Sequence, residues 1–62
     1  MNYDEWEDEV TTLVESKCDV TRSDAQGIVM AQPFVMAQSW GKGLSAEETA
    51  SLVDEASRVK TS

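Results

Sequence analysis

AQGIVMAQPFVMAQSW, residues 25–40, is the longest apolar run of this 62-residue chain, and it contains the one proline, Pro33. In a helical projection, one broad face carries Ala25, Ile28, Val29, Gln32, Val35, Met36 and Trp40. A narrower strip with Met30, Phe34 and Ala37 lies on the far side. A helix that is apolar on two sides is either the central helix of a bundle or an interface helix.

Two residues weaken this helix locally. Pro33 has no amide hydrogen to donate and crowds the carbonyl of Val29, so a kink or a break is expected there. Gly27 costs about 1 kcal/mol relative to alanine inside a helix. We therefore expect tertiary contacts to hold residues 22–40 helical.

Amphipathic segments flank the central run. The earlier segment has a stripe at helical spacing, made of Tyr3, Trp6, Val10, Leu13 and Val14. The later segment has Leu52, Val53, Ala56 and Val59 pointing one way. The sequence predicts an all-α fold, a compact three-helix bundle in a single domain over residues 1–62. Its helices are expected at about 2–18, 22–40 and 45–59, with the second helix central and kinked or broken at Pro33.

Capping signals mark the helix ends. Four pairs have capping-box spacing: Asn2/Glu5, Thr21/Asp24, Ser23/Gln26 and Ser45/Glu48. The second helix therefore has two candidate starts, Thr21 and Ser23. Gly41 or Gly43 suits the left-handed residue that follows a helix.

The chain is acidic, with 12 Asp and Glu against 5 Lys and Arg and a formal net charge of −7. Direct binding of nucleic acid or of an anionic membrane is not expected, because both require a basic patch. Carboxylates gather on one side of the first predicted helix: Asp4, Glu5, Asp8, Glu9 and Glu15. This acidic face is either a solvated surface that keeps the protein soluble or a row of charges that imitates DNA phosphates.

The residue types exclude several chemistries. There is no histidine, and Cys18 is the one cysteine, so His-based catalysis, an internal disulfide and a Cys/His zinc site are excluded. We predict no catalytic, cofactor or metal site and no enzyme. Cys18 is expected to be a half-buried thiol at a helix end, with a pKa lowered slightly by Lys17. The lone thiol, the acidic start and the lack of a membrane span favour a cytoplasmic protein.

Two stretches carry a resemblance to known proteins. Residues 21–27, TRSDAQG, and residues 40–50, WGKGLSAEETA, resemble small uncharacterised helical proteins of phages and prophages. Those proteins tend to combine a Ser-x-x-Asp-Ala helix start with a Gly-x-Ser-x-x-x-x-Ala helix start. The resemblance implies a phage or mobile-element origin and supplies no functional residues.

These observations favour recognition over turnover. We expect a non-catalytic accessory protein that binds an unnamed protein partner, with Met30, Phe34 and Ala37 as the candidate partner surface. A homodimer through the second helix is one form of this hypothesis. The opposing interpretation is that the flanking helices cover this strip inside the monomer. The alternative function is an acidic inhibitor that mimics DNA.

Overall fold

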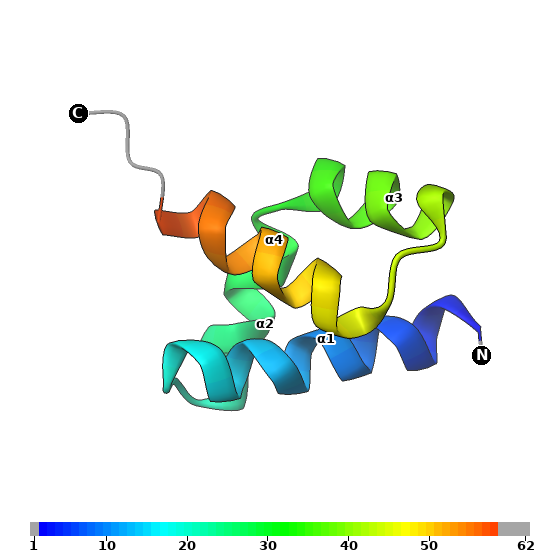
Figure 1. Cartoon of the computed structure of the whole chain (residues 1–62). Coiled ribbons are helices and arrows are strands. Elements are labelled where there is room, and N and C mark those ends of the chain that lie inside the picture. Colours follow the sequence, from blue (N-terminus) through cyan, green and yellow to red (C-terminus); the bar gives the residue numbers. More distant parts are fainter. Residues whose placement is uncertain (1, 59–62) are drawn as a thin grey trace.

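The computed structural model describes residues 2–58, which form four helices and no strand (Figure 1). The helices are α1 (Tyr3–Cys18), α2 (Arg22–Met30), α3 (Pro33–Lys42) and α4 (Ala46–Arg58). The predicted all-α class is confirmed. The predicted three-helix bundle is wrong, because the segment expected as one helix over residues 22–40 forms two.

Pro33 produces a break, not a kink. Gln32, the residue before the proline, leaves the helical region with φ −123° and ψ 56°, because a following proline disfavours the helical conformation. Its amide donates to the carbonyl of Val29 at 3.0 Å, so the group that Pro33 would have left unpaired is satisfied. Pro33 then takes the first position of α3, where a missing amide hydrogen costs no helical hydrogen bond.

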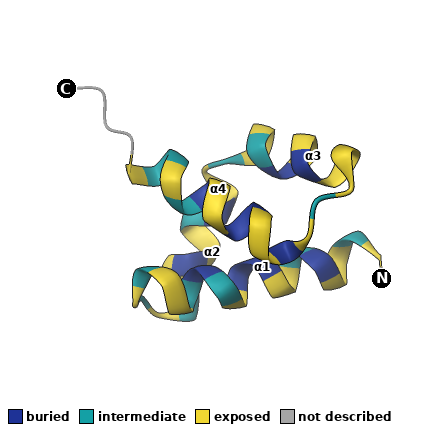
Figure 2. Cartoon of the chain, in the orientation of Figure 1, coloured by how far each residue is buried: buried dark blue, intermediate teal, exposed yellow. Residues whose placement is uncertain are grey.

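The core draws on all four helices. Its buried apolar residues are Trp6, Val10, Val14, Ala25, Val29, Met36, Ala46, Ala50 and Val53 (Figure 2). The most extensive packing joins α1 to α4, and α4 also contacts α2 and α3. α2 likewise contacts the other three helices, whereas α3 packs mainly on α2 and α4. The central position predicted for residues 22–40 therefore holds for α2 and not for α3.

The core face of α4 differs from the predicted one. Val53 is buried as expected, but Leu52 is 41% exposed, and the buried face consists of Ala46, Thr49, Ala50 and Val53. Apart from Val53, the buried face of α4 thus consists of small side chains that precede the predicted face in the sequence. Val59 lies outside the described residues.

Most predicted caps are present. Asn2 and Glu5 form a reciprocal capping box, with the Glu5 amide donating to Asn2 Oδ1 at 2.9 Å. Thr21, and not Ser23, caps α2, and Ser45 accepts from the Glu48 amide at 3.1 Å. The left-handed residue after α3 is Gly43, with φ +73°. The left-handed residue after α1 is Asp19, which no sequence signal had suggested.

An aromatic cluster closes the end of the molecule near the start of α1. The Trp6 ring packs against both Tyr3 and Trp40, with ring centroids 5.5 Å and 5.1 Å away. The Tyr3 and Trp40 rings meet edge to face at 5.2 Å. Trp6 Nε1 donates to the carbonyl of Leu44 at 3.1 Å, so this side chain joins α1 to α3 and to the loop before α4.

Candidate interaction surface

The predicted apolar strip faces solvent. The exposed fraction is 77% for Met30 and 73% for Phe34, and Ala37 is exposed as well. The interpretation that neighbouring helices cover this strip inside the monomer is therefore wrong. Met30 and Phe34 are four residues apart in the sequence, and large apolar side chains that gather exposed on a small protein are typical of interaction sites.

The strip crosses the break between α2 and α3. Met30 is the last residue of α2, and Phe34 is the second residue of α3. The broad face predicted for the same segment does reach the core, since Ala25, Val29 and Met36 are buried. The buried face and the exposed strip thus remain on different sides of this segment, although the single helix from which they were predicted is broken into α2 and α3.

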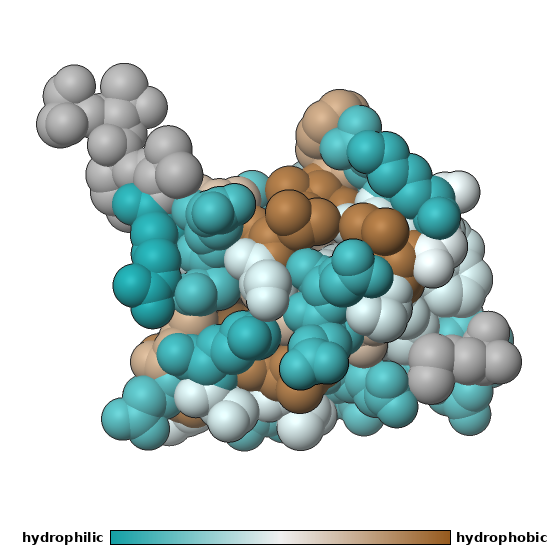
Figure 3. Space-filling view, viewed as in Figure 1, coloured by the Kyte–Doolittle hydropathy of each residue, from teal (hydrophilic) through white to brown (hydrophobic). Residues whose placement is uncertain are grey.

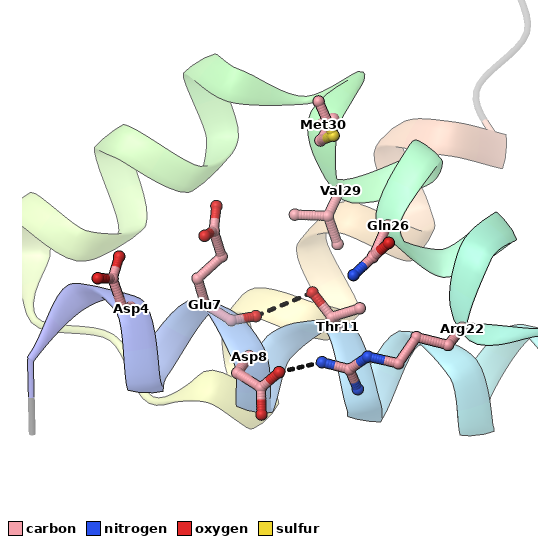
Figure 4. Close-up of a pocket in the computed structure, with 8 residues that line it drawn as sticks. All are labelled: Asp4, Glu7, Asp8, Thr11, Arg22, Gln26, Val29 and Met30. Atoms are coloured by element: carbon pink, nitrogen blue, oxygen red, sulfur yellow. Dashed lines mark hydrogen bonds and ion pairs between the residues drawn. The ribbon is translucent and has the colours of Figure 1, made fainter.

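An open groove leads along α1 and α2 to the strip (Figure 4). It is lined by Asp4, Glu7, Asp8, Thr11, Arg22, Gln26, Val29 and Met30. Asp4 and Glu7 project from α1 toward the side of the groove on which α3 lies, and Met30 stands at its far wall (Figure 4). Met30 therefore belongs both to the exposed strip and to a groove with carboxylates along one side.

The acidic face is partly neutralised by a residue of α2. Arg22 forms an ion pair with Asp8, a second ion pair with Glu15 at 3.1 Å, and a hydrogen bond to Thr12 Oγ1 at 3.0 Å. Asp4, Glu5, Asp8 and Glu9 are exposed, and Glu15 is half-buried. Two of the five predicted carboxylates are thus held against a cation, which interrupts the row of negative charge.

Sequence reasoning missed Glu7 as a groove residue. Glu7 lies three residues after Asp4 and four before Thr11, so helical spacing alone indicates that these three share one side of α1. Burial raises the pKa of Tyr3, and the negative charges of Glu7 and Asp4 raise it further. The charge of Glu7 therefore acts on a neighbouring side chain. The position of Arg22 opposite Asp8 follows from the turn between α1 and α2, for which the sequence has no comparable signal.

Cys18 is the half-buried helix-end thiol that the sequence predicts. Its Sγ donates to Asp54 Oδ1 at 3.0 Å, and Arg58 Nε donates to the same oxygen at 3.0 Å. The hydrogen bond to Asp54 and burial raise the pKa of Cys18, which outweighs the opposite effects of Arg58 and Lys17. Lys17 does act to lower this pKa, as expected, but its effect is smaller than those of Asp54 and burial.

We expect Asp54→Asn to make Cys18 more reactive, because the carboxylate that repels the thiolate is removed. The rate of alkylation by iodoacetamide at about pH 8 should rise several-fold, and its pH profile should move to lower pH. Asp19→Asn is the control, since it removes the carboxylate next in sequence and should leave the profile in place. An unshifted profile in Asp54→Asn would show that the hydrogen bond does not control the thiol.

The same contact gives folding a defined pH dependence. Since the folded pKa of Cys18 is raised, its contribution to stability is present below the thiol's unfolded pKa and is lost as pH rises through the folded value. The hydrogen bonds from Cys18 and then Arg58 lower the pKa of Asp54. The Asp54 contribution has the opposite sign: it is present above the unfolded pKa and is lost as pH falls through the folded value.

No group of His, Cys, Asp and Glu side chains within residues 2–58 is placed to hold a metal ion. None of the four helices has the length and apolarity to cross a bilayer. Comparisons with protein-family models, curated proteins and solved structures found no match. The fold and the surface define a small all-α protein with an exposed apolar strip beside an acidic groove.

Proposed function

We propose that this protein is a non-catalytic accessory protein that binds another protein through Met30, Phe34 and Ala37. The observation that carries the proposal is the exposure of Met30 and Phe34, the two most exposed large apolar side chains of the described chain. Covering them with a partner removes apolar surface from water, at roughly 25 cal/mol for each Å². Methionine adapts its shape readily to a partner, which suits a recognition surface.

The residue types support binding over catalysis. The sequence has no histidine, and its one thiol has a raised pKa, which makes it a poorer nucleophile near neutral pH. The carboxylates near the strip line an open groove and not the enclosed pocket in which catalytic carboxylates are usually found.

The acidic face supports DNA mimicry less well than the strip supports protein binding. Arg22 pairs with Asp8 and Glu15, and Glu5 is engaged in the capping box of α1. A mimic of DNA requires an uninterrupted run of negative charge to compete for a basic groove. We therefore propose the apolar strip, and not the acidic face as a whole, as the recognition surface.

We expect Met30→Gln/Phe34→Gln to abolish partner binding while leaving the fold intact. Both side chains are exposed, so their loss should change the free energy of unfolding by less than about 0.5 kcal/mol each. Tagged wild-type and variant proteins would be used to capture partners from the native cell. Melting followed by circular dichroism would verify that both are folded.

The matched control is Leu52→Gln, which changes an exposed apolar residue of α4 outside the strip. Partners retained by Leu52→Gln and lost by the double variant support the proposal. Partners retained by both variants would contradict it, because the strip would then contribute nothing to recognition.

A further inference from the structure

We propose that the occupant of the strip and groove is a cationic amphipathic segment of a partner protein. Its apolar residues cover Met30 and Phe34, and its Lys or Arg side chains lie in the groove against Asp4 and Glu7. This inference rests on the proposed function and adds the chemistry of the partner.

The groove makes the apolar and charged parts one surface. Met30 contributes to the wall of the groove, with Val29 beside it, while Asp4 and Glu7 stand along α1 (Figure 4). A single bound segment can therefore reach the apolar strip and the carboxylates together. This spatial arrangement matches a helix or strand with apolar residues on one side and cations along its edge.

The carboxylates of the groove are available to a partner. Among residues 2–58, Arg22 engages Asp8, whereas no ion pair joins Asp4 or Glu7 to another side chain. A cation from outside would therefore not have to displace an internal one. Glu7 is half-buried, and a charge there is less screened by water than one on an open helix face.

Charge also selects against a second copy of this chain. Each copy has a formal net charge of −7, so two copies repel one another as they approach. A symmetric dimer through the strip would bring the Asp4 and Glu7 carboxylates of both copies toward one interface. A cationic segment instead gains from the same field, which speeds its association and fixes its orientation.

The space-filling view shows a second apolar region, between α3 and α4 (Figure 3). The groove there is lined by Val35, Leu52 and Ala56, with Glu55 as its one charged residue. It does not combine exposed large side chains with a row of carboxylates. Of these two grooves, the one beside Met30 is therefore the one whose charges indicate the chemistry of a bound partner.

The test uses three fluorescently labelled synthetic peptides: a Leu/Lys amphipathic helix, the same helix with Glu replacing Lys, and a Lys/Gln peptide without Leu. Anisotropy titrations with the full chain measure each affinity. We expect only the Leu/Lys peptide to bind, and more weakly as salt is raised. Its affinity should fall about three- to thirtyfold with Asp4→Asn/Glu7→Gln.

Two further variants assign the site. Glu9→Gln/Glu55→Gln removes the same amount of charge outside the groove and should leave the affinity near the wild-type value. Met30→Gln/Phe34→Gln should abolish binding of the Leu/Lys peptide. Equal losses from the groove and control charge variants would overturn the inference, because attraction would then depend on net charge alone.

The remaining outcomes separate this inference from the proposed function. If the Leu/Lys and Leu/Glu peptides bind equally well and both require Met30 and Phe34, the cationic partner is wrong while the strip remains a binding surface. If no peptide binds at about 0.1 mM, the cationic partner is wrong, and partner capture decides the proposed function separately. A dimer in sedimentation that Met30→Gln/Phe34→Gln abolishes would identify a second copy as the occupant.

Discussion

Trp6→Ala is expected to remove a large share of the protein's stability. The Trp6 side chain is 3% exposed, packs against Tyr3 and Trp40, and donates to the carbonyl of Leu44. Truncating a buried tryptophan costs about 3–5 kcal/mol. A domain of this size has roughly 3–9 kcal/mol of stability in total. Far-UV circular dichroism during thermal and urea denaturation measures the loss.

Two companion variants separate the contributions of Trp6. Trp6→Phe keeps an aromatic ring but leaves the Leu44 carbonyl without its donor, so a smaller loss of about 1–3 kcal/mol is expected. Trp40→Ala should also cost less, because Trp40 is partly exposed. A melting temperature unchanged by Trp6→Ala would mean that the aromatic cluster does not support the fold.

Ala50→Leu is expected to destabilise the fold by about 1–3 kcal/mol through overpacking. Ala50 is fully buried on α4, which contacts all three other helices. Three additional heavy atoms at this position require α4 to move away from its neighbours or require side chains to leave their preferred rotamers. Urea denaturation with an unchanged slope would report this as a loss of stability in an otherwise similar fold.

Ser51→Leu is the matched control, because it introduces the same side chain one residue further along α4. Ser51 is exposed, so the free energy of unfolding should stay within about 0.5 kcal/mol of the wild-type value. Similar losses in both variants would indicate that leucine is tolerated poorly anywhere on α4. Close packing at Ala50 would then not be the reason.

Helix positions and caps followed well from the sequence where the signal was local. The stripe of α1 was predicted correctly at Trp6, Val10 and Val14, because large apolar residues at helical spacing leave one choice of buried face. The Asn2/Glu5 box was equally clear, since both of its hydrogen bonds form within one turn. These features need no knowledge of what lies opposite.

The errors arose where the position of a neighbouring helix determines which residues are buried. Leu52 was expected in the core on the same face as Val53, but α4 buries Ala46, Thr49 and Ala50 with Val53, and the position of the neighbouring helices determines which face is covered. At Pro33 the sequence indicated a kink or a break. The structure has a break, because Gln32 leaves the helical conformation.

The sequence predicted which residues form the candidate surface, but it did not predict what surrounds them. Periodicity placed Met30 and Phe34 opposite the core face, yet it could not tell a covered strip from an exposed one. That distinction depends on the path of α1 and α4, which meet across a long sequence separation. The link from Arg22 to Asp8 and Glu15 depends instead on how the turn between α1 and α2 places the two helices.

The pairing of α1 with α4 also has a consequence for biosynthesis. The apolar face of α1 has its main partner about forty residues later in the chain, around Val53. At a translation rate of about 5–20 residues per second, Trp6, Val10 and Val14 wait roughly 2–8 s for that partner to be made. During this interval the early cover comes from α2 and then from Trp40 of α3, and the carboxylates of α1 keep the nascent segment hydrated while the rest of its apolar side remains open.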